Sequence, residues 1–195
     1  MFTQAALASD MSLGMPVRTA QDTARHLLGG LDDRWQHTQG VARRAAELAD
    51  LLDADPDVLV TAAWLHDIGY AGCLGVTGFH PLDGADYLVG HGWPVRIAGL
   101  VAHHSGARFV AAARGLARAL AAYPDEGGPI ADALTYADQT VGPRGDRVTI
   151  DQRHAEMLHR HGPESWNAKA DHLRAPYLRA VVGRVEARLS ALSYA

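Results

Sequence analysis

Apolar residues recur at helical spacing along most of the chain, and no run of alternating apolar and polar residues predicts a strand. The clearest helix start is Asp55-Pro56, a capping carboxylate followed by proline at the first helical position. Helices are predicted over about 19–28, 33–52, 56–69, 81–89, 94–104, 110–122, 129–141, 151–160 and 164–192, and Pro176 is expected to kink or split the last one. The pattern therefore predicts an all-α fold.

One domain is expected, because 195 residues suffice for one well-packed domain and are few for two. We predict a loose arm over residues 1–17 and a single helical domain over 18–195. The 48% share of hydrophobic residues is ordinary for a soluble globular protein. No stretch approaches the ~20 apolar residues that a membrane-spanning helix needs.

The formal net charge of −4 argues against a nucleic-acid polymer or an anionic membrane as the main partner. The single cysteine, Cys73, cannot form an intramolecular disulfide, which fits a reducing compartment. The first residues lack a basic start and a sustained apolar run, so no signal peptide is expected. These features together predict a cytoplasmic protein.

Several ionisable residues fall where helical periodicity calls for a core residue, and His80 stands before Pro81 at a helix start. Buried ionisable groups tend to be paired or to coordinate a metal, and a buried polar pair is the simpler alternative. Imidazole and carboxylate ligands together suit divalent Mn, Fe, Co, Ni or Zn. The residues at core positions are His37, His66, Asp67, His104 and Asp138.

The order of these residues resembles the HD superfamily of metal-dependent phosphohydrolases, over about residues 35–145. The strings that carry the resemblance are His37-Thr-Gln-Gly-Val-Ala, Trp64-Leu-His-Asp-Ile-Gly-Tyr70 and Tyr136-Ala-Asp138-Gln-Thr. Two further strings, Phe79-His-Pro-Leu-Asp-Gly-Ala85 and Val101-Ala-His-His-Ser105, are similar to the extra histidines of two-metal members. Those members include diadenosine tetraphosphate hydrolases and cyclic-dinucleotide phosphodiesterases.

The resemblance implies a helical bundle around a buried site for one or two divalent ions of Fe, Mn, Co, Ni or Zn. It implies hydrolysis of a nucleotide or of another small phosphate ester or anhydride through a metal-activated hydroxide, with His66 and Asp67 as catalytic residues. Asp67 would bridge two ions. The implied ligands are His37, His66, Asp67 and Asp138 for the first ion, and His80 and His104, with His103 nearby, for the second.

The chain departs from the family pattern at Tyr70, where many relatives carry a lysine that can contact the substrate phosphate. A phenol is neutral at pH 7 and cannot supply that charge. We therefore expect Tyr70 to line the substrate site and Arg108, Arg144 or Arg147, in the loops after His104 and Asp138, to bind phosphate. The Gly-Tyr-Pro string of cyclic-dinucleotide phosphodiesterases is absent after His104, which weakens that assignment.

Two other functions stay open. The first is a di-iron oxygenase, since some HD-fold proteins use the same six metal ligands to cleave carbon bonds with oxygen. The second is a degenerate HD domain that binds a ligand without turnover. A degenerate domain is expected to lack at least one metal ligand, but the four ligands implied for the first ion are all present. We expect a small phosphorylated substrate as the partner. Whether His103 or His104 ligates, and whether the chain forms a homodimer, also stays open.

Overall fold

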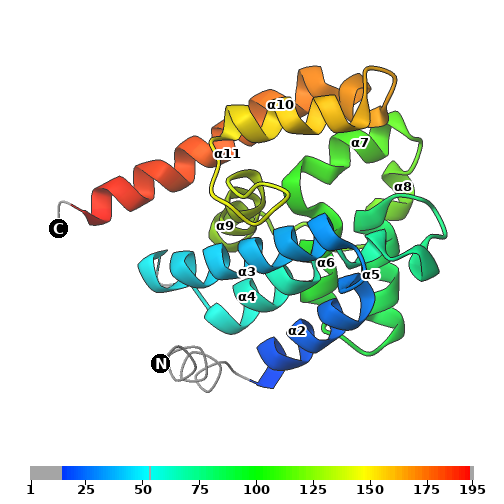
Figure 1. Cartoon of the computed structure of the whole chain (residues 1–195), viewed down its shortest axis with the longest axis horizontal. Helices are drawn as coiled ribbons and strands as arrows, with labels where there is room; N and C mark the ends of the chain where they lie inside the picture. The colour runs from blue at the N-terminus through cyan, green and yellow to red at the C-terminus, as the bar shows by residue number, and fades with distance from the viewer. Residues whose placement is uncertain (1–14, 53, 194–195) are drawn as a thin grey trace.

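The computed structural model describes residues 15–52 and 54–193, and these residues form helices joined by short loops (Figure 1). The described residues contain no β-strand, and their one isolated β-bridge joins Val141 to Arg147. The predicted all-α fold is confirmed.

The helices follow one another along the chain with three 3₁₀ turns among them. The first five α-helices are α2 (Met15–Leu28), α3 (Asp32–Leu52), α4 (Pro56–Leu65), α5 (His80–Gly90) and α6 (Val95–His103). The later α-helices are α7 (Ala107–Ala113), α8 (Ala117–Leu120), α9 (Gly128–Gln139), α10 (Ile150–His161) and α11 (Trp166–Leu192). The 3₁₀ turns are η1 (Ile68–Tyr70), η2 (Gly72–Leu74) and η3 (His104–Gly106).

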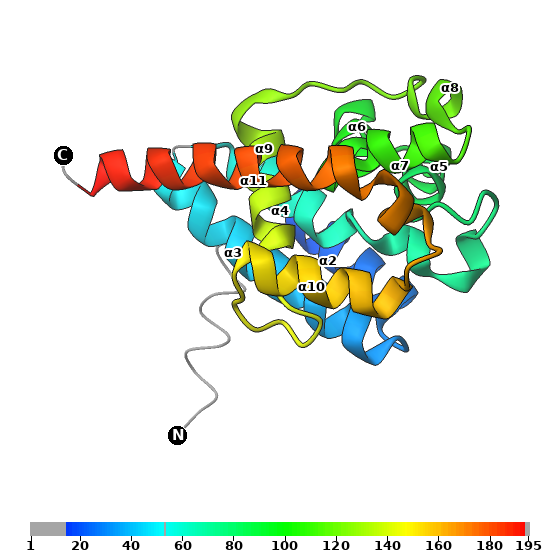
Figure 2. The same ribbon diagram turned by 90° about the horizontal axis from the view of Figure 1, so that it is seen from above.

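The central packing unit is formed by α3, α4 and α9, and α2 covers α4 from the other side. Helices α5 and α6 pack against each other, and α11 lies over α7 and α9. Seen from above, α10 and α11 lie over α9, and the C-terminal part of α11 extends beyond the bundle (Figure 2). Fully buried leucines fill the core, among them Leu48, Leu59, Leu65 and Leu134.

Side-chain caps fix the starts of α4, which leads to His66 and Asp67, and of α10, which carries two arginines of the cavity. Asp55 accepts hydrogen bonds from the backbone N–H groups of Asp57 and Val58, and Pro56 is the first residue of α4. Thr149 and Gln152 form a capping box at the start of α10. Both starts agree with the sequence-based boundaries to within one residue.

Four boundaries differ from the prediction. Helix α2 begins at Met15, so the last three residues of the predicted arm are helical, while residues 1–14 lie outside the described part. The regular part of α4 ends at Leu65, and the 3₁₀ turn η1 follows it. The predicted 110–122 helix is divided into α7 and α8 because Gly115 adopts a φ of +73°. Helix α11 continues through Pro176 as one element.

None of the described helices is both long and apolar enough to cross a membrane.

Candidate metal centre and the cavity above it

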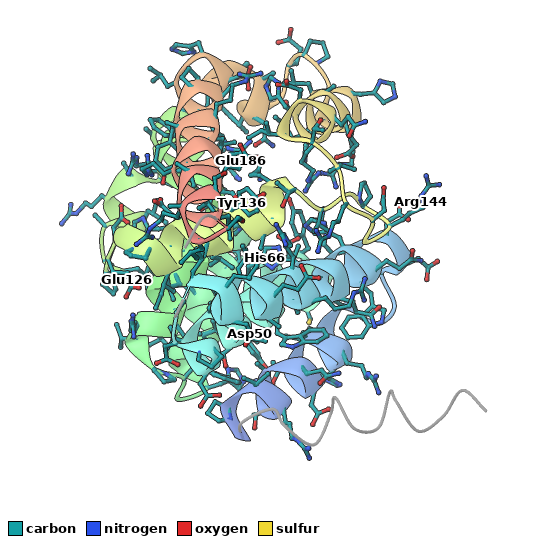
Figure 3. The ribbon with its side chains drawn as sticks, turned by 90° about the vertical axis from the view of Figure 1, so that its left-hand side faces the viewer. Asp50, His66, Glu126, Tyr136, Arg144 and Glu186 are labelled. Carbon is teal, nitrogen blue, oxygen red and sulfur yellow. The ribbon has the colours of Figure 1, made fainter. Side chains whose placement is uncertain are left out.

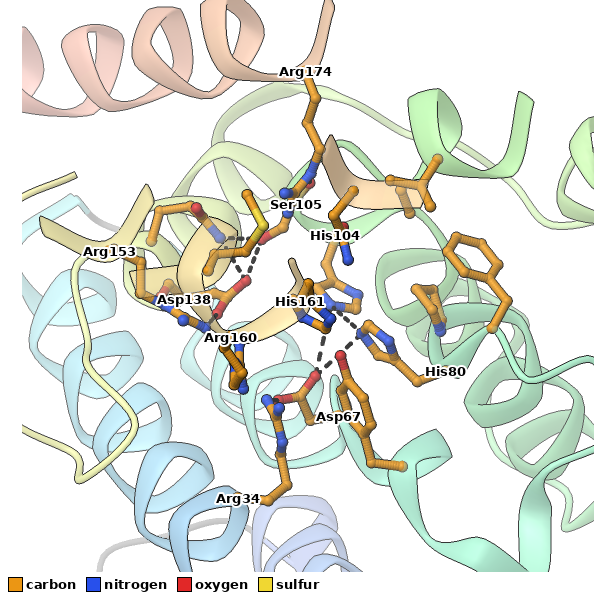
Figure 4. Close-up of a pocket in the computed structure, with 18 residues that line it drawn as sticks. Arg34, Asp67, His80, His104, Ser105, Asp138, Arg153, Arg160, His161 and Arg174 are labelled. Carbon is orange, nitrogen blue, oxygen red and sulfur yellow. Dashed lines mark hydrogen bonds and ion pairs between the residues drawn. The ribbon is translucent and has the colours of Figure 1, made fainter. Parts of the chain in front are cut away.

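Two groups of potential metal ligands lie next to each other in the interior. The first group is His37 on α3, His66 at the end of α4 and Asp138 on α9; the second is Asp67, His80 and His104. Within each group the ligand atoms all lie within 4.8 Å of one another. We call them the first and second ligand groups. Figure 4 shows Asp67, His80 and His104 pointing into one pocket, with Asp138 on its opposite side.

Backbone carbonyls fix the orientation of three of the imidazoles. The Nδ1 atom of His66 donates to the carbonyl of Ala63 at 2.7 Å, and that of His104 donates to Val101 at 2.6 Å. The Nδ1 atom of His37 lies 3.1 Å from the carbonyl of Gly142. A hydrogen bond that holds the proton on Nδ1 leaves Nε2 as a lone pair, which is the arrangement that metal-ligating histidines use.

Asp67 stands between the two ligand groups. Its Oδ2 atom lies 3.3 Å from His66 Nε2 and 3.8 Å from His37 Nε2. Its Oδ1 atom lies 3.3 Å from His80 Nε2 and 3.9 Å from His104 Nε2. Each carboxylate oxygen therefore faces a different group, as a carboxylate that bridges two ions must.

Several buried polar atoms of the two ligand groups lack good hydrogen-bond partners and are better suited to coordinate divalent ions. The Nε2 atom of His66 is buried without a hydrogen bond, although Asp67 Oδ2 is close by. The Nε2 atoms of His80 and His104 face each other at 3.4 Å. Buried polar atoms without good partners are costly in a folded protein. Divalent cations with imidazole and carboxylate ligands would satisfy all of these atoms.

The electrostatics of the centre keep both carboxylates charged. Burial alone would raise the pKa of Asp67, but Arg34 and His66 beside it hold that pKa well below its usual range. Burial is likewise outweighed at Asp138, where the close contact with His37 Nε2, 3.0 Å from Oδ1, and the charge of Arg153 depress the pKa. Burial lowers the pKa of His80 and of His104. Anionic carboxylates and neutral imidazoles are the protonation states that bind metals.

A left-handed corner between α6 and α7 brings a hydroxyl group to Asp138. Ser105 has a φ of +50° and Gly106 a φ of +68°. This conformation is unusual for serine, and it turns the Ser105 hydroxyl toward the carboxylate of Asp138, to which it donates a short hydrogen bond. The side chain of Gln139 also donates to Asp138, at 2.9 Å. Both hydrogen bonds reach Oδ2, while Oδ1 faces His37.

Glycine at position 69 permits the close approach of η1 and α5. A Cβ atom added to Gly69 would lie 2.0 Å from the carbonyl oxygen of His80 and 2.7 Å from the amide nitrogen of Gly84. Neither backbone atom belongs to a flexible side chain, so this contact needs glycine for space rather than for its backbone angles. The contact places the turn that carries Asp67 against the helix that carries His80.

Four arginines line the cavity above the ligand groups, which has a volume of about 60 Å³. Arg34 comes from α3, three residues before His37, and its Nη1 atom lies 2.5 Å from Asp67 Oδ2. We call the other three the arginine wall, since α10 and α11 carry them on one side of the cavity: they are Arg153, Arg160 and Arg174. A cavity of this size suits water molecules or a small polar ligand rather than a polymer.

Tyr70 lies between Arg34 and His80 as the middle member of a stack. The guanidinium of Arg34 lies 4.0 Å from the centre of the Tyr70 ring, and the His80 ring stacks on the other side at 4.0 Å with an interplanar angle of 18°. A cation over an aromatic face is attracted by the ring quadrupole. The residue that replaces the relatives' lysine therefore supports an arginine instead of supplying charge itself.

Three residues from the sequence-based set lie apart from this cavity. His103 turns away from the second ligand group, and its Nε2 atom contacts the carbonyl of Tyr123 at 3.1 Å. Arg108 stacks on Phe109 and Tyr177 and lies 3.6 Å from Asp125, in a neighbouring cavity. Arg144 is exposed and points away from the body of the molecule, whereas His66 lies inside it (Figure 3). Of His103 and His104, only His104 joins a ligand group.

Arg147, which was also expected to bind phosphate, has an exposed side chain that pairs with Glu47. Arg34 and the arginine wall were not among the expected site residues. Two signals could have revealed them: Arg34 precedes His37 by one helical turn, and Arg153 and Arg160 are seven residues apart on one face of α10. Arg174 follows no motif in the sequence, because α11 meets the ligand groups only through the tertiary fold.

One of three comparisons with known proteins gives a match. The family model of the HD domain matches residues 34–139, a segment that contains both ligand groups. The comparison with curated proteins and the comparison with solved structures found no match. HD domains bind divalent metals and are in general metal-dependent phosphohydrolases. The match covers more than half of the chain, and the chain therefore belongs to the HD domain family.

Proposed function

We propose that this protein is a metal-dependent phosphohydrolase that acts on a small phosphorylated compound. One observation carries the proposal: a single small cavity is lined by the whole second ligand group, by Asp138 of the first group and by four arginines. Guanidinium groups bind phosphate oxygens in pairs, which favours a phosphorylated substrate over a neutral one. The size of the cavity favours a small molecule over a nucleic-acid polymer.

The six residues of the ligand groups would hold the ions, and Asp67 would share its two oxygens between them. Divalent ions in such a site supply a water nucleophile near neutral pH and neutralise charge on a phosphoryl group. Ser105 and Gln139 orient Asp138 through hydrogen bonds, while backbone carbonyls orient His37, His66 and His104. The protein thus contributes a rigid donor set, since Arg34 holds Asp67 in the same way and His80 is held by its stack on Tyr70.

Arg34 is the proposed substitute for the lysine of the relatives. It lies at the edge of the second ligand group, next to Asp67, and Tyr70 holds its guanidinium from one face. An arginine can donate to two phosphate oxygens at once, which lysine cannot do. We infer that Arg34 binds and orients the phosphoryl group that reacts.

The proposal is tested by loading metal-free protein anaerobically with Mn, Fe, Co, Ni or Zn and measuring phosphate release from a panel of small phosphate esters and anhydrides. We expect release that depends on one of these metals and stops when the metal is removed by a chelator. Oxygen uptake by the iron-loaded protein, without phosphate release under any condition, would instead favour the oxygenase.

A further inference from the structure

Arg174 is a buried cation without a carboxylate partner. Its side chain comes from the middle of α11 and is only 9% exposed. Its Nε atom donates to the carbonyl oxygen of Ser105 at 2.9 Å. Among the described residues, no carboxylate lies within ion-pair distance of it, and burial lowers its pKa. An arginine nevertheless keeps its charge in proteins, so this charge needs a counter-ion.

The other three arginines of the cavity are already compensated. Arg34 pairs with Asp67. Arg153 lies 2.5 Å from Glu156 and 3.5 Å from Asp138, and Arg160 lies 3.1 Å from Glu156. Arg174 therefore differs from its neighbours in having no carboxylate that balances its charge, and its two Nη groups are left for a ligand.

Arg34 and Arg174 lie at opposite ends of the cavity, with metal ligands between them (Figure 4). Arg34 lies next to Asp67 at one end, while Arg174 reaches down from α11 to Ser105 at the other end (Figure 4). A single phosphoryl group held near Asp67 by Arg34 leaves the far end, where Arg174 lies, without an anion. The geometry thus has two places for negative charge.

We propose that Arg174 is a specificity-determining residue that binds a second anionic group of the substrate, distinct from the phosphoryl group that reacts. The substrate class is then a small compound with two anionic groups, such as two phosphates or a phosphate and a carboxylate. This inference rests on the proposed phosphohydrolase function and narrows its substrate. The guanidinium of Arg174 would bind the second group through two parallel hydrogen bonds.

The test compares the binding of one anion and of two anions to manganese-loaded protein by calorimetry. Inorganic phosphate is the probe with one anionic group, and methylenediphosphonate, which is not hydrolysed, is the probe with two. We expect the wild type to prefer the diphosphonate, and Arg174→Gln to reduce that preference about tenfold to a hundredfold, the factor that follows from lost charge-assisted hydrogen bonds. Arg174→Lys should keep part of the preference, since it keeps the charge but loses the planar fork.

The matched control is Arg188→Gln, which removes an exposed arginine from the same helix and should leave the preference unchanged. Circular dichroism and metal content establish that each variant is folded and loaded. A wild type without preference for the diphosphonate overturns the inference, and so does an unchanged preference in a folded Arg174→Gln. If the preference depends on Arg174 but no phosphate compound is hydrolysed, the second-anion site stands and the phosphohydrolase proposal fails.

Discussion

The base of the cavity and its arginine wall are built from different parts of the chain. Both ligand groups lie between His37 and Asp138, inside the segment that matches the HD domain. The arginine wall comes entirely from α10 and α11, beyond residue 139. Backbone carbonyls fix three of the four histidines at the base, whereas the arginines of the wall are held by carboxylates or by a single carbonyl, and Arg160 is about one-third exposed.

This difference separates two tasks along the sequence. Ligands that hold a metal must keep their positions to within fractions of an ångström, so they occupy buried helix ends with a second hydrogen-bond partner. Groups that select a substrate can differ between members of one family without changing the metal site. We infer that the family match describes the chemistry and that the C-terminal helices decide what the chemistry acts on.

Replacing Asp67 should reduce metal binding and activity more than any other single substitution, because its carboxylate faces both ligand groups. We expect Asp67→Ala to lose most of the bound metal and at least about a thousandfold of the activity, since several kcal/mol of transition-state stabilisation depend on the ions. Metal analysis, phosphate release and circular dichroism check this. Asp50→Ala, an exposed acid on α3, is the control. Retained turnover with normal metal content in the Asp67 variant would remove the basis for the metal-dependent proposal.

The second ligand group can be tested separately from the first. Replacing His80 or His104 by alanine should lower the metal content from two ions toward one and reduce activity by about a hundredfold, because one of two charge-neutralising ions is lost. His103→Ala is the matched control, since the neighbouring histidine contacts Tyr123 instead of Asp67. A wild type that binds a single ion, together with fully active His80 and His104 variants, would make this a one-metal protein.

A substitution at Arg34 tests the cation that the proposed mechanism needs beside the base. We expect Arg34→Gln to raise the KM for a phosphorylated substrate about tenfold to a hundredfold, which corresponds to the ~1.5–3 kcal/mol of a charge-assisted hydrogen bond. Metal content should stay normal. Arg108→Gln should leave the KM unchanged, because Arg108 lies in the neighbouring cavity and pairs with Asp125. An unchanged KM in Arg34→Gln together with a raised KM in Arg108→Gln would instead assign phosphate binding to Arg108.

The smallest expected effect is the pH dependence of stability in the metal-free protein. Burial lowers the pKa values of His37, His80 and His104 below 6.5, so on unfolding near that pH each of them takes up protons. Their contribution to stability is present above pH 6.5 and declines as the pH falls through that value. His66 acts in the opposite direction, because Asp67 outweighs burial there and raises its pKa. Burial also lowers the pKa of His161, so the net effect should be a loss of stability toward acid pH.

Denaturant unfolding of chelator-treated protein measures this effect. We expect the free energy of unfolding to decrease as the pH is lowered from about 7.5 to about 5.5, by at most about 1.4 kcal/mol per pH unit for each proton taken up. His159 is exposed and serves as the control position, so His159→Gln should leave the slope unchanged. A stability that rises toward acid pH would mean that these histidines are protonated in the folded protein.

The ligand groups could be predicted from the sequence because each ligand obeys a local pattern. His37 and Asp138 continue apolar stripes on their helices, and His66-Asp67 and His104 come at helix ends. Local periodicity also gave most helix boundaries to within a few residues. It could not show that α7 and α8 are separate, since that break depends on the positive φ of Gly115.

The arginines around the cavity could not be predicted in this way. Position near the motifs suggested Arg108, only four residues after His104, but the left-handed corner at Ser105 and Gly106 turns the chain and carries Arg108 out of the cavity. Arg174 is 36 residues beyond Asp138 in the sequence, and only the packing of α11 over α7 and α9 brings it back. Contacts of this kind leave no periodic signal.

Because Gly69 has no side chain, the turn that carries Asp67 and the helix that carries His80 can lie very close together. The turn with Asp67 and the helix with His80 touch backbone to backbone there, so a methyl group would act as a spacer between them. The spacer would lengthen the distance from the Asp67 carboxylate to the His80 imidazole without changing any donor atom. Ions differ in the ligand distances that they accept. Residue 69 is therefore a position at which side-chain volume, without any change of donor atoms, can alter which metal the protein prefers.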